Sequence, residues 1–303
     1  MFSKFLALAG LLAGTIATPI TANHSIVIPP AVKHSCGTHH TGEALEMASI
    51  LAAEEASGTM GFIETAARPS IDIDVYMHVV QSKHNNVEKN LNWQMAVMNH
   101  AYEPHNIHFS LRGVTWTINE TWAQGGDDMA MKSALRRNNY ATLNLYYIES
   151  FGSKDGDDGL IGLCTYPTTV LSPGEDAVIR DGCTIKAETL PGGGAAHYDL
   201  GKTTVHEIGH WLGLLHVFEG YSCEGDGDYI DDTPPQSEVT WDCPVRKRSC
   251  PELEGAWDSI HNYMDYSNGQ CPTEFTPGQE VRMFTAWSKF RHSFAVAEPV
   301  HGI

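Results

Sequence analysis

The sequence predicts an α+β fold in which helices alternate with the strands of a mixed sheet. Residues 71–80 alternate between apolar and polar side chains and are rich in β-branched residues, which is typical of a strand. Residues 90–102 instead carry apolar side chains at helical spacing and stop before Pro104. Where helices and strands alternate along a chain, a partly parallel sheet is favoured.

The other elements follow the same two patterns. An Ala- and Glu-rich stretch precedes the first strand, and the run from Pro191 to Gly194 breaks the chain before a histidine-rich segment. We expect helices at residues 43–56, 90–102 and 129–137, and strands at residues 71–80, 107–117 and 143–148.

The N-terminal residues have the form of a secretory signal. Lys4 precedes an apolar run at residues 5–13 that is too short to span a bilayer. A buried N-terminal helix is the alternative. No later stretch reaches the ~18 apolar residues of a membrane helix, so we expect a secreted, extracellular protein. The expected divisions are a signal peptide at residues 1–17, with cleavage as late as residue 22, a pro-segment at residues 18–68 and a folded domain at residues 69–303.

Composition narrows the classes of partner. Hydrophobic residues make up 42% and charged residues 18%, which is ordinary for a globular protein and excludes a disordered or fibrous chain. The formal net charge is −18. Nucleic-acid binding is therefore not expected, because a phosphate backbone requires a basic surface. Binding to an anionic membrane is disfavoured for the same reason.

Export makes the seven cysteines disulfide candidates, because exported proteins fold in an oxidising compartment. Seven is an odd number, so at least one cysteine must be unpaired, pair with another chain, or be removed. The sequons at Asn23 and Asn119 could carry glycans in a eukaryotic host.

A metal site is predicted in the segment Thr-Thr-Val-His-Glu-Ile-Gly-His-Trp-Leu-Gly-Leu-Leu-His, residues 203–216. His206 and His210 are four residues apart and share one helix face, with Glu207 between them near enough to polarise a water. Gly213 can adopt positive φ, end the helix and turn His216 back toward the metal. Three histidines with an open fourth position describe a catalytic zinc site. The alternative is a helix on which these histidines are merely packed.

A second motif accompanies the histidines. The histidine segment has the pattern H-E-x-x-H-x-x-G-x-x-H, and Asn262-Tyr263-Met264-Asp265-Tyr266 resembles the Met-turn that follows it in metzincins. The runs at residues 211–218, 227–234 and 262–267 closely resemble the pappalysin family of metzincins, in particular its short secreted fungal and bacterial members.

The resemblance implies a zincin fold and an endopeptidase activity. An upper lobe would hold a twisted mixed sheet and the active-site helix. A smaller, irregular lower lobe, crosslinked by disulfides, would hold the Met-turn and a C-terminal helix at residues 281–290. A monomer would bind protein or peptide substrates in the cleft between the lobes, along an edge strand to which residues 176–180 are expected to belong. Glu207 would be the general base, Tyr266 would help to stabilise the oxyanion, and Met264 would form a floor beneath the zinc ligands.

The resemblance also implies a structural calcium site. Asp226, Asp228, Asp231 and Asp232 are interleaved with glycines, as in oxygen-rich calcium loops, although a solvated acidic loop is the alternative. Pappalysin relatives bind calcium at this loop, so we expect Asp228, Asp232 and Thr233 to be ligands.

Spacing leaves three pairings open among the four late cysteines. The resemblance implies Cys223–Cys250 and Cys243–Cys271, which leaves Cys164 and Cys183 for each other. Cys36 remains, inside the expected pro-segment. Its thiolate could occupy the fourth zinc position and keep the enzyme latent. His34, His39 or His40 could approach the metal instead, or Cys36 could be an unpaired thiol without consequence.

Two other classes compete with the peptidase hypothesis. An inactive homologue that binds zinc and acts as a binding module would keep the fold, but the presence of Glu207 argues against it. A disulfide-rich structural protein would not need three histidines arranged around Gly213.

Overall fold

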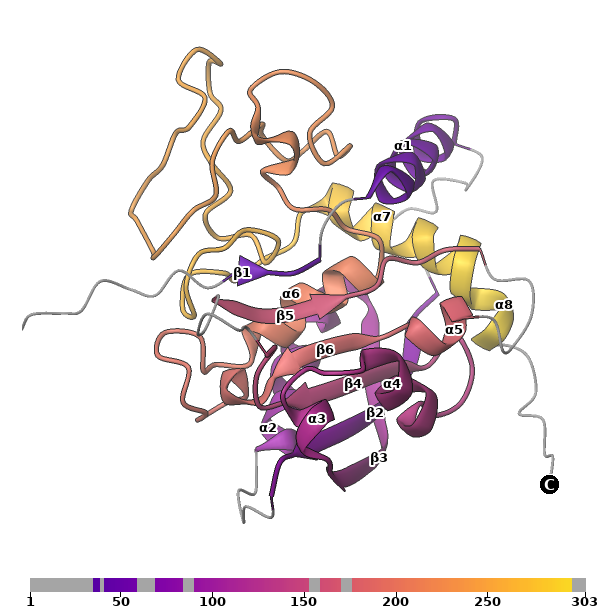
Figure 1. Ribbon diagram of the computed structural model, residues 1–303. Helices are drawn as coiled ribbons and strands as arrows, with labels where there is room; N and C mark the ends of the chain where they lie inside the picture. Colours follow the sequence, from indigo (N-terminus) through magenta and orange to yellow (C-terminus); the bar gives the residue numbers. More distant parts are fainter. Residues whose placement is uncertain are drawn as a thin grey trace, which may run out of the picture. The chain divides into compact units, whose positions relative to one another are not determined.

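A six-stranded mixed sheet lies at the centre of the computed structural model, in the order β1-β5-β6-β4-β2-β3 (Figure 1). The structure describes residues 35–38, 41–58, 69–83, 90–152, 159–169 and 176–295. All neighbouring strands are parallel except β5 and β6, which are antiparallel. The predicted α+β class with a mixed sheet is therefore confirmed. The strands are β1 (Ser35–Cys36), β2 (Ile71–Gln81), β3 (Ile107–Ile118), β4 (Leu143–Ile148), β5 (Leu160–Cys164) and β6 (Cys183–Lys186).

Helices cover both faces of the sheet. The helices are α1 (Gly42–Ala56), α2 (Leu91–Tyr102), α3 (Glu120–Ala123), α4 (Asp128–Leu135), α5 (Asp176–Arg180), α6 (Lys202–Trp211), α7 (Pro277–Ala286) and α8 (His292–Ala295), and a π-helical turn, η5 (Trp287–Arg291), joins α7 to α8. Single turns of 3-10 helix lie at Glu103–His105, Ala187–Thr189 and Glu219–Tyr221. Every helix and strand that we expected from helical spacing or from strand alternation is present, with shifts of a few residues at the ends.

Alternation along the central strands builds two apolar layers. Val79 of β2 and Tyr147 of β4 pack in the main core with α2 and α6. Their neighbours Val80 and Tyr146 point to the opposite face, into a smaller cluster with α3 and α4. Helix α6 is therefore packed against the face of the sheet that the main core covers.

The expectation that residues 176–180 form an edge strand is wrong. These residues form the short helix α5, of which only Val178 is buried, against Tyr140 and Phe290. One buried side chain per turn suits a helix, and Asp176 and Arg180 lie at the ends where the helix dipole favours their charges. The edge next to the active site is formed by β5, with β1 added beyond it.

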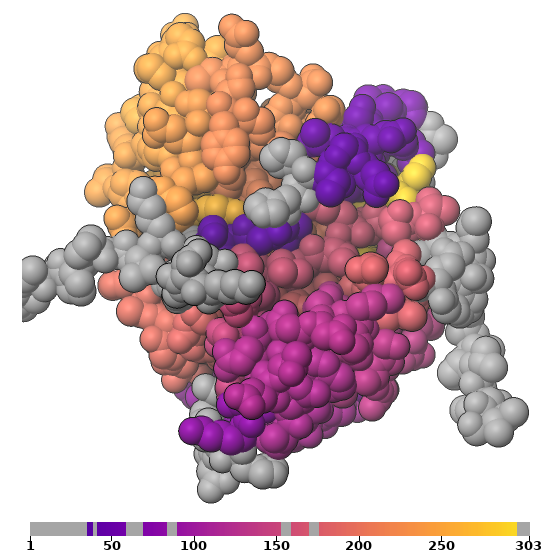
Figure 2. Space-filling model, in the orientation of Figure 1, coloured from indigo at the N-terminus to yellow at the C-terminus, as the bar shows by residue number. Residues whose placement is uncertain are grey.

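The segment between α6 and α7 is mostly irregular, and disulfides hold it together. Cys223–Cys250 and Cys243–Cys271 lie within this segment, while Cys164–Cys183 joins β5 to β6. These are the same pairs that were expected from the sequence. Figure 2 shows β1, in indigo, between this orange segment and the strands of the sheet.

The expected signal peptide and Asn23 lie outside the described residues, as do the three alternative metal-binding histidines, His34, His39 and His40. Asn119 is described, and its side-chain oxygen accepts a hydrogen bond from the backbone of Trp122 at the start of α3. Within the described ranges, no helix combines the length and apolar character required to cross a membrane.

Candidate active site

Helix α6 presents the two histidines and the glutamate of the predicted motif. The helix begins after Gly201, whose φ is 78°, and its residues from Thr203 to Trp211 are all buried. The Nε2 atoms of His206 and His210 are 3.1 Å apart, because the residues lie one helical turn apart on the same face.

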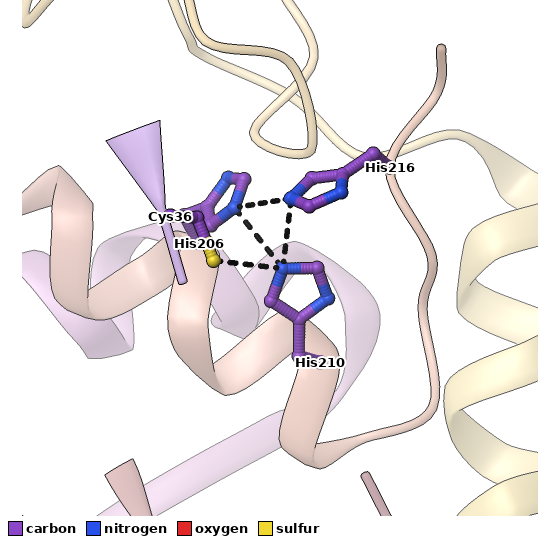
Figure 3. Close-up of side chains that lie close together, drawn as sticks. All are labelled: Cys36, His206, His210 and His216. Atoms are coloured by element: carbon purple, nitrogen blue, oxygen red, sulfur yellow. Dashed lines mark hydrogen bonds between the residues drawn. The ribbon is translucent and has the colours of Figure 1, made fainter. Parts of the chain in front are cut away.

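The helix ends at Trp211, and Gly213 then turns the chain back. Gly213 has a φ of 92°, and a Cβ atom at this position would lie only 2.8 Å from the Cβ of Ala286. The turn brings His216 beside the helix, with its Nε2 3.3 Å from that of His206 and 3.2 Å from that of His210 (Figure 3). The structure therefore brings the three predicted zinc ligands together.

Hydrogen bonds to the main chain orient two of these rings. Nδ1 of His206 donates to the carbonyl of Tyr263 at 2.7 Å, and Nδ1 of His210 donates to the carbonyl of Leu214 at 2.8 Å. Because a carbonyl can only accept, the proton of each neutral ring is on Nδ1 and the Nε2 lone pair is free. Burial lowers the pKa of His206 to about 4, and it also lowers the pKa of His210 well below its usual value, which keeps both rings neutral.

This arrangement fits a zinc ion. Neutral Nε2 lone pairs at these distances would repel one another unless a cation lay between them. The Sγ atom of Cys36 lies 3.5 Å from Nε2 of His210, and the four candidate ligand atoms all lie within 4.8 Å of one another. Three imidazoles and one thiolate are a donor set that Zn²⁺ takes in tetrahedral geometry.

Glu207 lies beside this cluster and is fully buried. Its Oε2 accepts a hydrogen bond of 3.1 Å from the Thr38 hydroxyl, while its Oε1 has no hydrogen-bond partner within the described part of the chain. Burial raises the pKa of Glu207 to about 8, and hydrogen bonds with Cys36 and Thr38 oppose this rise. Strand β5 approaches closely because position 162 is glycine, where a Cβ would lie 2.5 Å from Oε1 of Glu207.

The predicted Met-turn lies below the three histidines. Met264 is fully buried, and a Cβ on Gly209 would overlap its Sδ, so the methionine packs directly against α6. The ring of Tyr266 lies 5.0 Å from that of His216, and its hydroxyl donates to the carbonyl oxygen of Cys36 at 3.2 Å. Tyr266 can therefore reach a carbonyl oxygen that lies next to the metal site.

Strand β1 holds Cys36 in place along the outer edge of β5. The backbone nitrogen of Ser35 donates to Gly159 at 2.8 Å, and that of Gly37 donates to Gly162 at 2.7 Å. Burial, and then the negative charge of Glu207, raise the pKa of the Cys36 thiol. A thiolate at this position therefore requires a cation beside it.

The predicted calcium ligands of the acidic loop lie in two different places. Asp228 is buried, and its Oδ1 accepts hydrogen bonds from the hydroxyl of Thr233 at 2.6 Å and the backbone of Ile230 at 3.2 Å. Its Oδ2 is buried without a partner among the described residues. Burial raises the pKa of Asp228 to about 7. Asp232 instead accepts from Thr276 and Gly278, and thus contacts the first turn of α7.

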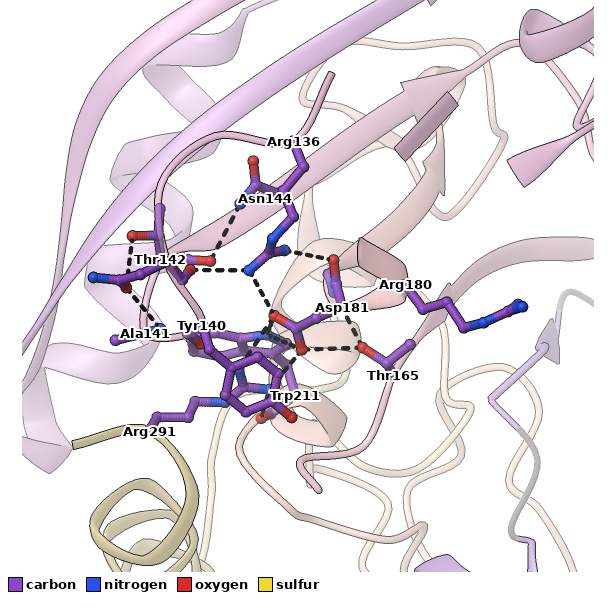
Figure 4. Close-up of polar contacts among 12 residues, drawn as sticks. Arg136, Tyr140, Ala141, Thr142, Asn144, Thr165, Arg180, Asp181, Trp211 and Arg291 are labelled. Carbon is purple, nitrogen blue, oxygen red and sulfur yellow. Dashed lines mark hydrogen bonds and ion pairs between the residues drawn. The ribbon is translucent and has the colours of Figure 1, made fainter. Parts of the chain in front are cut away.

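A buried ion-pair network supports the C-terminal end of α6, and no pattern in the sequence indicates it. Asp181 accepts hydrogen bonds from Trp211 at 3.0 Å, from Arg291 at 2.8 Å and from Thr165 at 3.2 Å (Figure 4). Burial alone would raise the pKa of Asp181, but Arg291 and Arg136 lower it below its usual value. Because Trp211 follows His210 directly, this network fixes the helix end that carries a zinc ligand.

Comparison with known proteins agrees with this geometry. Residues 127–287 match the peptidase M43 family described as pregnancy-associated plasma protein-A. Extracellular metalloprotease 1 of Coccidioides posadasii is 43% identical over 268 residues, which cover 87% of this chain and 92% of the relative. An extracellular metalloprotease of Colletotrichum graminicola is 46% identical over 262 residues, which cover 84% of this chain and 90% of the relative.

A solved structure shares the fold. Mature mirolysin of Tannerella forsythia, in complex with a cleaved peptide, superposes with a TM-score of 0.59 and 25% identity. The match covers 77% of this chain and 100% of mirolysin. The α+β metzincin fold is thereby confirmed. The chain belongs to the pregnancy-associated plasma protein-A family, the pappalysins, and is a zinc metalloendopeptidase.

Proposed function

We propose that this protein is a secreted endopeptidase that hydrolyses peptide bonds of protein substrates at a zinc site formed by His206, His210 and His216. The observation that carries the proposal is the convergence of three Nε2 atoms within 3.3 Å of one another, beside the buried carboxyl group of Glu207. Secretion is proposed because the relatives above are extracellular metalloproteases.

The residues around the site fit the steps of peptide hydrolysis. When bound, a zinc ion supplies Lewis acidity, which lowers the pKa of a water molecule from 15.7 toward ~7. Glu207 accepts a proton from the attacking water and delivers it to the leaving amine. Tyr266 donates a hydrogen bond to the oxyanion, as its hydroxyl does here to the Cys36 carbonyl. Met264 takes no part in proton transfer and supports α6 from below.

We also propose a structural calcium ion at the acidic loop. The buried Oδ2 of Asp228 lacks a partner among the described residues, and Thr233 lies beside the same carboxylate. Oxygen atoms of this kind are the ligands that Ca²⁺ prefers. Asp232, the third expected ligand, is engaged at the start of α7 and would have to reach the ion from there.

The division of the chain is a further part of the proposal. Residues 1–17 form the signal peptide, residues 18–68 the pro-segment and residues 69–303 the catalytic domain. Cys36 keeps the unprocessed protein latent as the fourth zinc ligand, which is supported by its position 3.5 Å from Nε2 of His210. Removal of the pro-segment also removes the only free cysteine of the described residues.

The test measures zinc content together with cleavage of casein. The secreted protein, after removal of its pro-segment, should contain one zinc ion per chain and cleave casein, and a zinc chelator should abolish the cleavage. A protein that holds zinc but leaves casein and a mixed peptide library uncut would contradict the proposal and favour the binding-module alternative. In the unprocessed chain, Cys36→Ala should raise cleavage, and unchanged latency would refute the role of Cys36.

A further inference from the structure

The segment that follows Cys36 contacts the second half of the catalytic machinery. Side chains of an extended segment alternate, so Cys36 and Thr38 point to the same side. Both side chains are buried toward α6, with 7% and 5% of their surface exposed. A Cβ on Gly37, between them, would instead meet the side chain of Leu160. One short segment therefore presents a thiol to the metal site and a hydroxyl to the glutamate beside it.

The hydroxyl of Thr38 has three polar neighbours. It accepts a hydrogen bond from the backbone nitrogen of Cys164 at 2.8 Å. Its single proton can go to Oε2 of Glu207, at 3.1 Å, or to the carbonyl of Cys164, at 3.3 Å. The Oε2 atom of Glu207 is the closer of these two acceptors.

We propose that Thr38 is a second inhibitory contact, which binds the general base Glu207 while Cys36 binds the metal. The proposal rests on the proposed function and deepens it, because it concerns the regulation of the same site. A carboxylate that accepts the Thr38 hydroxyl has one oxygen fewer with which to orient and deprotonate a water. Latency is then shared between two residues of one segment.

The backbone of Cys164 offers a purely structural explanation of the same threonine. Thr38 could simply tie the end of β1 to β5 and have no energetic connection with Glu207. The two explanations differ in one respect. If the hydroxyl donates to Glu207, replacing the glutamate removes most of the effect of replacing the threonine, whereas a tie to Cys164 is independent of Glu207.

The experiment uses the zinc-loaded, unprocessed full chain and measures how fast iodoacetamide alkylates Cys36. This readout needs no peptidase activity, because Cys36 is the only free cysteine of the described residues and reacts only when its segment leaves the site. Thr38→Val keeps the shape and removes the hydroxyl, so alkylation should accelerate by about 10- to 100-fold. Thr38→Ser keeps the hydroxyl and should stay within about threefold of the wild type.

A double-mutant cycle then separates the explanations. In a Glu207→Ala chain, Thr38→Val removes only the hydrogen bonds with Cys164, so the acceleration of alkylation should be several-fold smaller than in the wild-type background. An equal acceleration with and without Glu207 would overturn the proposal and leave Thr38 as a structural tie. No acceleration in the single variant would overturn it as well.

A second readout covers the case in which alkylation is limited by the metal. The reference is the unprocessed chain that carries Cys36→Ala alone. Adding Thr38→Val to it should raise casein cleavage by about 10- to 100-fold, and adding Thr38→Ser should not raise it. No difference between the two variants would contradict the proposal. Failure of the proposed function gives a different result: the processed enzyme would not cleave casein, or Cys36 of the wild type would react as fast as in the unfolded chain.

Discussion

Single atoms of a few residues determine what the active site can do. Glu207 lies in a pocket that only a glycine at position 162 leaves open, and its carboxylate is fully buried beside the three imidazoles. The three imidazoles converge on one another, so this carboxyl group, and none of the three rings, is left to accept a proton.

Replacement of this carboxylate should separate binding of zinc from catalysis. Glu207→Gln keeps the size of the side chain but cannot accept a proton, so cleavage of casein should fall by about 10²- to 10⁴-fold while the zinc content and the melting temperature remain. Metal analysis of the same preparation is the control. More than a tenth of the wild-type activity would mean that another group is the base.

Gly213 controls the third zinc ligand through its backbone. A valine there must adopt a φ of 92° and would collide with Ala286, so Gly213→Val should lose zinc in the same way as His216→Ala. Gly255→Val is the matched control, because Gly255 also has positive φ, 77°, but nothing lies within 4 Å of its Cβ. Normal zinc content in both His216→Ala and Gly213→Val would refute the three-histidine site.

At the scale of secondary structure, the contact between α1 and α7 has an ion pair at its centre. Glu55 binds Arg282 through both oxygens, at 2.8 and 3.1 Å, and the Arg282 side chain is fully buried. Glu54 and Lys289 form a second pair nearby. The expected pro-segment thus joins the folded domain through a helix as well as through β1.

Loss of the Glu55–Arg282 pair should lower the free energy of unfolding of the unprocessed chain. Removing one partner of a buried ion pair costs about 3–5 kcal/mol, and because Glu55 is 16% exposed we expect Glu55→Gln to lie near the lower end of that range. Glu46→Gln, on an exposed position of the same helix, is the control and should change stability by less than about 0.5 kcal/mol. Equal unfolding free energies for the two variants would show that the pair contributes nothing.

The secondary structure shows where prediction from sequence succeeds and where it ends. Strand β2 and helix α2 were predictable because their periodicity is local. The edge strand expected at residues 176–180 came from the family resemblance and not from a local pattern, and a five-residue segment is too short for periodicity to distinguish strand from helix. Strand β1 has only two residues and exists through its pairing with β5, which no local pattern encodes.

The same distinction applies to the active site. The zinc ligands lie within one turn of helix and one glycine turn, so their spacing predicts their convergence. Thr38, Gly162 and Asp181 act on this site from distant parts of the sequence. Their roles depend on tertiary contacts, which the spacing of residues along the chain does not contain.

For the whole molecule, the irregular segment between α6 and α7 depends on crosslinks and, by our proposal, on calcium. A calcium-selective chelator should lower the melting temperature before zinc is lost. A ligand that binds only the native state stabilises it by about 2.7 kcal/mol at a hundredfold excess over its dissociation constant. An unchanged melting temperature would indicate a solvated acidic loop.

The pH dependence of stability provides an independent test of the same site. Without calcium, burial raises the pKa of Asp228 to about 7, above the ~3.9 of an unfolded aspartate. The native state then binds more protons than the unfolded state between these values, so this carboxyl makes the free energy of unfolding fall as pH rises from about 4 to 7. Asp228→Asn should remove that slope in calcium-free denaturant titrations.

With calcium bound, the contribution of Asp228 to the stability of the wild type should increase with pH instead of decreasing. The ion binds the ionised carboxylate, so the stabilisation that it provides should grow as pH rises through about 7 and disappear at lower pH. Asp228→Asn should show little stabilisation by calcium at any pH. Full stabilisation of that variant would place the ion elsewhere.

The hydrogen bonds behind the zinc ligands affect how the site can be altered. His206 and His210 are held by the main-chain carbonyls of Tyr263 and Leu214 and not by side chains. A side chain can be deleted by one substitution, but a peptide carbonyl cannot. The orientation of these two rings is thus insensitive to most point mutations of the residues behind them. Redesigning the site for a metal with another geometry would require rebuilding the Met-turn and the Gly213 turn themselves.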